Sequence, residues 1–99
     1  MKDIKEKLST VINTGKIDYG FKKAVKNIYT GEPRLIIISN NTPPQMRDRI
    51  VYLSRLNDTP LIKVKQNSVD LASICGRQHS VSVLTVLDEG ESQILEGIS

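Results

Sequence analysis

Hydrophobic residues change their spacing repeatedly along this chain, from the three-to-four-residue period of helices to the alternating or continuous pattern of strands. Helical spacing predicts four helices, at residues 3–14, 20–30, 42–56 and 67–75. Strand-like patterns fall between them, at residues 16–19, 34–39, 61–65 and 81–87. Because helices and strands alternate in so short a chain, we expect an α/β/α sandwich with a central sheet.

Short polar motifs predict where the helices begin and end. Asp3 and Glu6 resemble a capping box, and Gly15 suits the C′ position after the first helix. Residues 42–45 are typical of a helix start, with a threonine cap, proline at N1 and glutamine at N3. A last apolar piece, residues 94–95, is expected to add an edge pairing.

Length and charge bound the possible functions. The chain has 99 residues, which fits a single domain spanning 1–99. Residues 1–87 hold all fourteen lysine and arginine residues and seven acids, a formal charge of +7, whereas residues 88–99 hold four acids and no base. A basic body of this kind favours a polyanionic partner such as RNA or an acidic membrane surface.

Several classes of protein are disfavoured. Cys75 is the only cysteine, so an internal disulfide is excluded. The first ten residues mix charges and contain no apolar signal-peptide core, and the longest apolar runs have four residues, far short of a membrane span. We therefore expect a cytoplasmic protein without a membrane partner.

Catalysis and metal binding find little support in the residues. Cys75 and His79 are four apart, as a thiol nucleophile and its base could be. However, Cys75 falls on the apolar side of a short helix, and no third group is evident to orient His79. Phosphate-binding loops, nucleophile elbows and dinucleotide fingerprints are absent, and one cysteine with one histidine makes no zinc site. The sequence predicts a non-enzyme without cofactor, and a thiol-dependent enzyme remains the weaker alternative.

Three polar loops could instead contact RNA. Residues 16–23 run into a helix N-terminus, where backbone N–H groups can bind phosphate oxygens and lysines add charge. Residues 39–42 offer asparagine amides that can donate to and accept from a base edge. Residues 76–80 offer Arg77 for phosphate and His79 for stacking. Each loop also has a purely structural interpretation: a solvated helix start, asparagines bonded to nearby backbone, and a solvated histidine.

Four motifs in order give the chain a family resemblance. They are Thr14-Gly15-Lys16-Ile17 with Gly20-Phe21-Lys22-Lys23, Leu35-Ile36-Ile37-Ile38 with Asn41-Thr42-Pro43, Gly76-Arg77-Gln78-His79-Ser80-Val81, and Gly90-Glu91-Ser92-Gln93-Ile94-Leu95. Together they resemble the L-thirty-e ribosomal proteins of archaea and eukaryotes, nearly end to end, and the archaeal type more closely. The wider L-seven-Ae group binds kink-turns, which are RNA helices sharply bent at an internal loop with sheared G·A pairs.

The resemblance implies a fold, a function and a site. The fold is an α/β/α sandwich around a four-stranded mixed sheet, with residues 81–87 antiparallel to residues 34–39. The function is that of a structural constituent of the large ribosomal subunit, monomeric when free, that binds ribosomal RNA at a kink-turn and takes no small-molecule substrate. The implied RNA-binding residues, to which the first loop adds Lys16, are Gly20, Phe21, Lys22, Lys23, Asn40, Asn41, Arg77, Gln78, His79 and Ser80.

Departures from the group's pattern bear on individual contacts. The L-seven-Ae branch reads the G·A pairs with an Asn-Glu pair where this chain has Lys22 and Lys23, so its base contacts are expected to differ. His79 stands where some relatives carry an aromatic ring. A free-standing kink-turn binder that works in RNA processing or modification is the principal alternative.

Overall fold

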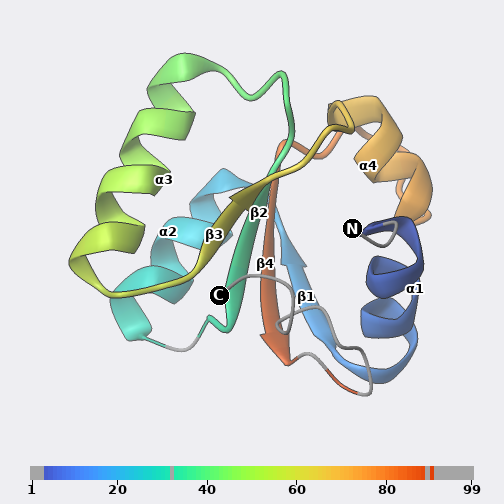
Figure 1. Ribbon diagram of the computed structural model, residues 1–99, viewed down its shortest axis with the longest axis horizontal. Coiled ribbons are helices and arrows are strands. Elements are labelled where there is room, and N and C mark those ends of the chain that lie inside the picture. Colours follow the sequence, from blue (N-terminus) through green and yellow to red (C-terminus); the bar gives the residue numbers. More distant parts are fainter. Residues whose placement is uncertain (1–3, 32, 89, 91–99) are drawn as a thin grey trace.

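The computed structural model describes residues 4–31, 33–88 and 90 (Figure 1). Within them, helices and strands alternate as the hydrophobic pattern predicts. The elements are α1 (Ile4–Thr14), β1 (Lys16–Tyr19), α2 (Phe21–Thr30), β2 (Leu35–Ile38), α3 (Pro44–Leu56), β3 (Leu61–Lys63), α4 (Ser68–Ile74) and β4 (Val83–Asp88).

The four strands form one mixed sheet in the order β1-β4-β2-β3. Strand β4 is antiparallel to both β1 and β2, whereas β3 is parallel to β2. The antiparallel pairing of the last strand with β2 was predicted and is confirmed. It follows that β1, β2 and β3 all run in one direction and β4 alone runs in the other.

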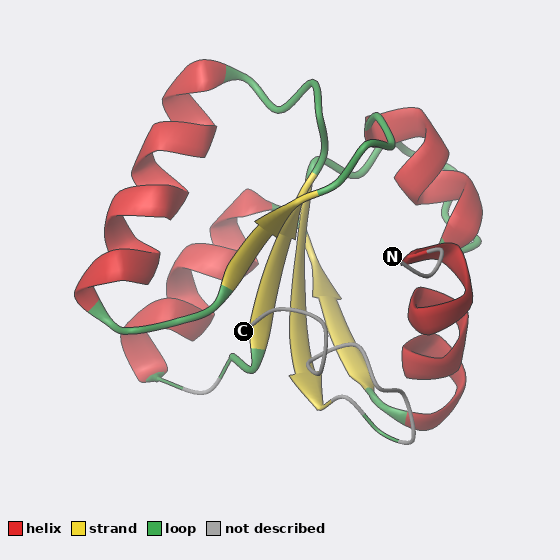
Figure 2. Cartoon of the chain, viewed as in Figure 1, coloured by secondary structure: helices red, strands yellow, loops and turns green. Residues whose placement is uncertain are grey.

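Helices cover both faces of the sheet, with α2 and α3 on one face and α1 and α4 on the other (Figures 1 and 2). The central strand β2 is buried on both sides, which explains its continuous apolar sequence. Its side chains alternate, so Leu35 and Ile37 join the cluster beneath α1 and α4 while Ile36 and Ile38 join the cluster beneath α2 and α3. The predicted three-layer α/β/α sandwich is therefore confirmed.

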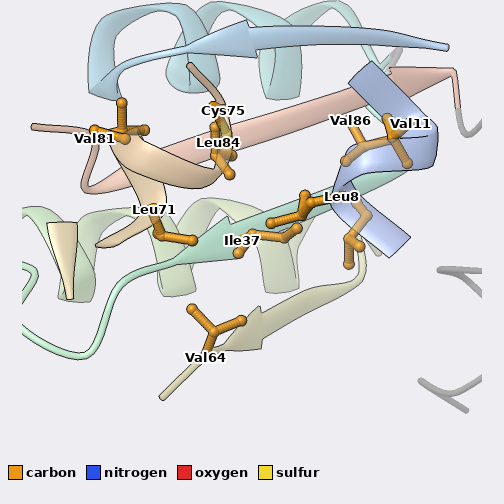
Figure 3. Packing of buried hydrophobic residues seen from close by; sticks show 11 residues of the cluster. Leu8, Val11, Ile37, Val64, Leu71, Cys75, Val81, Leu84 and Val86 are labelled. Carbon is orange, nitrogen blue, oxygen red and sulfur yellow. The ribbon is translucent and has the colours of Figure 1, made fainter. Parts of the chain in front are cut away.

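The cluster beneath α1 and α4 contains the single cysteine (Figure 3). Leu8 and Val11 of α1 and Leu71 of α4 are fully buried against the sheet. Cys75, at the end of α4, is only 8% exposed and packs in the same cluster. The thiol therefore contributes to the core, as its position on the apolar side of the helix predicts.

Two predicted helix ends were wrong in detail. Helix α3 begins at Pro44, and its N-cap is Pro43 without a side-chain hydrogen bond. Thr42 is instead buried, and its Oγ1 lies 2.9 Å from the carbonyl oxygen of Ser39. Gly15 does not adopt the left-handed conformation of a C′ glycine. Close packing requires it, because an added Cβ would collide with the carbonyl oxygen of Asp88.

Other ends agree with the predicted bounds, differ from them by a residue or two, or fall outside the described residues. Asn67 caps α4 by accepting a hydrogen bond from the Asp70 amide at 2.8 Å. Strand β4 begins at Val83, later than predicted, because the Val81 amide donates to the Ser68 carbonyl of α4 and not to a neighbouring strand. The proposed capping box at residue 3 and the edge pairing at residues 94–95 lie outside the described residues.

Candidate nucleic-acid interface

Strand directions bring three separate loops to one edge of the sheet. Strand β1 ends at Tyr19 opposite Leu84, and β2 ends at Ile38 opposite Val83, which begins the antiparallel strand β4. The loops that follow β1 and β2 therefore meet the turn that precedes β4. We call this region the loop edge and define it as residues 20–23, 39–42 and 76–82.

Backbone hydrogen bonds tie the three loops together at Ser82 and Val83. The Gly20 amide donates to the Val83 carbonyl at 2.9 Å, and the Ser39 amide donates to the Ser82 carbonyl at 2.9 Å. The hydroxyl of Thr42 also lies 3.2 Å from the Ser82 carbonyl oxygen. Because these bonds come from both neighbouring strands, the loops hold fixed positions relative to one another.

Three helices begin at the loop edge, because β1, β2 and β3 run in one direction and each is followed by a helix. The positive ends of the dipoles of α2 and α3 therefore point toward it, whereas the start of α4 is capped by Asn67 and carries Asp70 in its first turn. Gly20 at the N-cap of α2 and Pro43 at the N-cap of α3 form no side-chain capping bond, and the first turns of both helices lack acids. The edge thus offers uncapped N–H groups and partial positive charge, which suit an anion.

The start of α2 adds two full charges to this surface. Lys22 and Lys23 are both exposed in the first turn of the helix. Cations at a helix N-terminus oppose the dipole and cost about 0.3–1 kcal/mol each when exposed, so they give the helix no stability. Gly20 has φ 105° and ψ 157°, and no atom lies within 4 Å of where its Cβ would be. Backbone of this kind can be approached closely by a ligand.

The two asparagines of the loop edge form different hydrogen bonds. The side-chain oxygen Oδ1 of Asn41 accepts from the Ser68 backbone amide at 2.9 Å and from the Ser39 hydroxyl at 2.9 Å. The Asn41 side-chain nitrogen donates to Ser68 Oγ at 3.3 Å, which uses one of its two hydrogens. The Asn40 nitrogen donates to the Lys65 carbonyl at 2.6 Å. Asn41 therefore links the β2–α3 loop to the start of α4, and both amides are pre-oriented by the protein.

Arg77 is held against an aromatic ring. Its guanidinium carbon lies 4.4 Å from the centroid of the Tyr19 ring, within the range of a cation–π contact. The Arg77 amide donates to the Ala72 carbonyl at 2.8 Å, which fixes the backbone of the turn. Arg77 remains exposed, so its charge is available to a ligand at the loop edge.

Cys75 is near this pair, since Tyr19 and Arg77 both affect the pKa of its thiol. Burial raises the pKa of the Cys75 thiol, and Tyr19 and the Arg77 charge offset this only in part. Burial is also the largest cause that raises the pKa of Tyr19. A catalytic thiol needs a lowered pKa and exposure, so this environment favours the structural interpretation of Cys75.

An open groove of about 280 Å³ runs between the start of α2, the start of α3 and the turn before β4. Its lining includes the apolar side chains of Phe21 and Met46 and the polar side chains of Arg77, His79 and Ser80. Gln78, His79 and Ser80 are all exposed in this turn. The groove therefore combines an apolar surface for a base with donors around it.

The structure gathers all the predicted RNA-binding residues except one. Lys16 is the first residue of β1, at the end away from the loop edge. There its backbone pairs with that of Asp88 in β4, and it lies beside Arg34 and Leu87. It is thus at the opposite end of the sheet, about 10 Å along the strand from Tyr19. Strand β1 separates Lys16 from Gly20 by its whole length, so the two residues lie at opposite ends of the strand although they are close in sequence.

Other residues of the region were missed. Lys65 is exposed, and its carbonyl accepts from Asn40, because β3 is parallel to β2 and ends at the same edge. Tyr19 and Met46 were assigned no role, although one carries Arg77 and the other lines the groove. Lys65 could have been placed at this edge from the sequence if β3 had been assumed to run parallel to β2. The positions of Tyr19 and Met46 depend on side-chain packing, which the sequence does not show.

Within residues 4–31, 33–88 and 90, no three histidine, cysteine or acidic side chains gather closely enough to hold a metal ion. None of the helices in this part of the chain is long and apolar enough to cross a membrane.

Comparison with known proteins identifies the family. The model of the ribosomal protein L7Ae/L30e/S12e/Gadd45 family matches residues 2–96. The large ribosomal subunit protein eL30 of Aeropyrum pernix is 39% identical over 93 residues, which cover 94% of this chain and 93% of the relative. The eL30 protein of Pyrobaculum calidifontis is 36% identical and is covered to 95%, with 97% of this chain aligned. With a sandwich fold, a four-stranded mixed sheet and these matches along almost its whole length, the chain belongs to the ribosomal protein L7Ae/L30e/S12e/Gadd45 family.

Proposed function

We propose that this protein is a structural constituent of the large ribosomal subunit and binds ribosomal RNA at a kink-turn or a similar bent internal loop. The observation that carries the proposal is the loop edge, where the uncapped N-termini of α2 and α3, two lysines, Arg77 and two oriented asparagines lie together. The names of the archaeal relatives support the ribosomal part of the proposal.

The loop edge would stabilise the bend by countering phosphate repulsion. A sharp bend crowds phosphates, and Lys22, Lys23 and Arg77 supply full positive charges at the edge. Backbone N–H groups of the first turn of α2 add donors that suit phosphate oxygens, and the helix start can enter the widened groove of the RNA. These contacts position the RNA without reading its sequence.

Base recognition would fall to the polar side chains beside the groove. Asn41 has one side-chain N–H left to donate to a guanine edge, since its other groups bind Ser68 and Ser39. The side-chain oxygen of Asn40 has no hydrogen-bond partner among the described residues and can accept from a base. His79 would pack on an unpaired base or a ribose in the groove that Phe21 and Met46 also line.

We further propose a non-catalytic, single-domain protein that is monomeric when free and acts on the ribosome in the cytoplasm. Burial of Cys75 and its raised pKa support the absence of thiol catalysis. Lys16 is left out of the proposed interface because it lies at the other end of the sheet.

The decisive experiment compares binding to a kink-turn RNA with binding to the same RNA whose G·A pairs are replaced by Watson–Crick pairs. Both affinities are measured at two salt concentrations, because each neutralised phosphate adds about 0.7–0.9 to the log–log salt slope. A preference for the kink-turn that survives the higher salt is expected. Equal and salt-fragile binding to both RNAs would overturn the proposal.

A second measurement separates the ribosome from other RNA complexes. Sedimentation of cell extract in high salt is expected to carry the protein with large subunits. Kink-turn binding together with sedimentation apart from the subunits would instead support a free-standing role in RNA processing or modification.

A further inference from the structure

The outward surface of α2 and α3 carries exposed aromatic side chains among cations. Tyr29 of α2 is 63% exposed and Tyr52 of α3 is 62% exposed. Single exposed apolar residues are common on soluble proteins and need no explanation. Two large rings at related positions on neighbouring helices are a different observation, because their surroundings are strongly basic.

On α3 the aromatic ring stands between two arginines. Arg49, Tyr52 and Arg55 are each three residues apart and all exposed, so each is a neighbour of the next on the helix surface. At a rise of 1.5 Å per residue, the two arginines are separated by about 9 Å along the helix axis. The ring therefore lies between two positive charges on a surface open to solvent.

The two helices begin together and lie side by side over one face of the sheet (Figures 1 and 2). Both start at the loop edge, α2 at Phe21 and α3 at Pro44. Tyr29 and Tyr52 each follow the helix start by eight residues, about 12 Å along the axis. Both rings are thus at a similar distance along their helices from the loop edge.

Charge decides which partner this surface fits. Helix α2 contains three lysines and no acid, and Lys26 is exposed on the same helix as Tyr29. Helix α3 contains three arginines and one acid, Asp48, which lies 3.3 Å from the Nε of Arg47. Leu56, four residues after Tyr52, is also 63% exposed. Cations outnumber the one acid on these helices, and aromatic rings among cations suit a flexible polyanion with stacking bases better than an apolar protein surface.

We propose that the outward surface of α2 and α3 is a second RNA-binding surface, on which an unpaired stretch of RNA stacks a base on Tyr52. Arg49 and Arg55 contact the phosphates on either side of that base, and Lys26 and Tyr29 extend the surface across α2. The proposal rests on the proposed function, since the unpaired stretch would continue from the RNA bent at the loop edge.

The test compares a kink-turn RNA with the same RNA carrying a single-stranded tail of about ten nucleotides on one strand or on the other. Base–aromatic stacking and the added phosphate contacts are expected to make one tailed RNA bind about tenfold more tightly to the unaltered protein. Tyr52→Ala should reduce this gain to about twofold or less, while Tyr52→Phe should keep it because phenylalanine retains the stacking face. Asn13→Ala, at an exposed site near the end of α1 on the other face of the sheet, is the control and should change nothing.

Affinity for the untailed kink-turn RNA is the internal reference. If the kink-turn is preferred but neither tail adds affinity, the second surface is overturned while the proposed function stands, and a protein becomes the better candidate partner for α2 and α3. If a tail adds affinity equally in the Tyr52→Ala variant, the assignment to Tyr52 is overturned.

Photo-cross-linking makes the test independent of kink-turn preference. A tail containing 4-thiouridine is expected to label residues of α3 in the unaltered protein and to lose that label in the Tyr52→Ala variant. Labelling confined to residues 76–82 would overturn the proposal, because the tail would then remain at the loop edge.

Discussion

The guanidinium of Arg77 lies over the ring of Tyr19, 4.4 Å from its centroid, and this contact joins the turn before β4 to the end of β1. A long arginine side chain would otherwise sample many rotamers, and ordering it on binding costs free energy. The tyrosine ring therefore pre-orients a charge at the loop edge.

Tyr19→Leu is expected to weaken kink-turn binding about two- to fivefold, because an exposed cation–π contact contributes about 0.5–1 kcal/mol. Tyr19→Phe should bind nearly as well, since it keeps the ring under Arg77. Equilibrium binding of both variants at one salt concentration checks this. If Tyr19→Phe lost as much affinity as Tyr19→Leu, the Tyr19 hydroxyl would matter more than the ring.

Asn41 should show two separable effects. Asn41→Ala removes the acceptor of the Ser68 amide and the Ser39 hydroxyl, so the free energy of unfolding should fall by about 1–3 kcal/mol. Asn41→Asp keeps the acceptor and should fold with nearly unaltered stability. It loses the donor and adds a negative charge, so RNA affinity should fall strongly. Urea unfolding and RNA titration of both variants test this, and an Asn41→Asp protein with full RNA affinity would exclude Asn41 from base contact.

The position of Lys16 provides a matched control for the charges of the loop edge. Lys22→Gln is expected to reduce the log–log salt slope of RNA binding by about 0.7–0.9, because one phosphate contact is lost. Lys16→Gln removes the same charge at the other end of the sheet and should leave the slope unchanged. Titrations across a salt series give both slopes. Equal slopes in the two variants would contradict the assignment of the interface to the loop edge.

Gly15 should be intolerant of any side chain. An alanine Cβ would collide with the Asp88 carbonyl oxygen and lie 3.0 Å from the Gly90 nitrogen. Backbone must move to relieve this, so Gly15→Ala should lower the free energy of unfolding by about 1–3 kcal/mol. Gly31→Asn is the control, because that site is open and asparagine tolerates its left-handed φ of 74°. Urea denaturation compares them, and an unaffected Gly15→Ala protein would refute the packing explanation.

Stability should fall at alkaline pH because of the buried thiol. Burial raises the pKa of Cys75 above its ordinary value of 9.0, so the unfolded chain loses the proton first. Below pH 9.0 the thiol is protonated in both the folded and the unfolded chain, so it does not change the stability with pH. As the pH rises from 9.0 toward the higher pKa of the folded protein, only the unfolded chain loses the proton, and the free energy of unfolding decreases. Urea unfolding from pH 7 to 10 should show the decrease in the unaltered protein and a smaller one in Cys75→Ala.

Thiol labelling provides an independent check on Cys75. Alkylation of the native protein at pH 7 should be much slower than alkylation of the urea-unfolded chain, because the thiol is buried and protonated. Fast native labelling would revive the alternative of a reactive, catalytic thiol.

Much of the fold follows from local patterns in the sequence. The continuous apolar run of residues 35–38 identified the central strand, because a strand covered on both faces needs apolar side chains on both. Gly31 ends α2 in a left-handed conformation and Asn67 caps α4 with its side chain, so both helix ends depend on local interactions. The prediction that Thr42 caps α3 was wrong, because its hydroxyl lies against the carbonyl oxygens of Ser39 and Ser82 and does not cap the helix.

The sequence by itself determined which segments form helices and strands, which of their faces are apolar, and which loops are polar enough to bind RNA. Periodicity and capping are short-range properties, so neighbouring residues suffice to specify them. Only the tertiary structure decided that the loops of β1 and β2 meet the turn before β4, that Lys16 lies at the far end, and that Tyr19 supports Arg77. Those relationships depend on strand order and direction, which arise from long-range packing and backbone pairing between residues far apart in the chain.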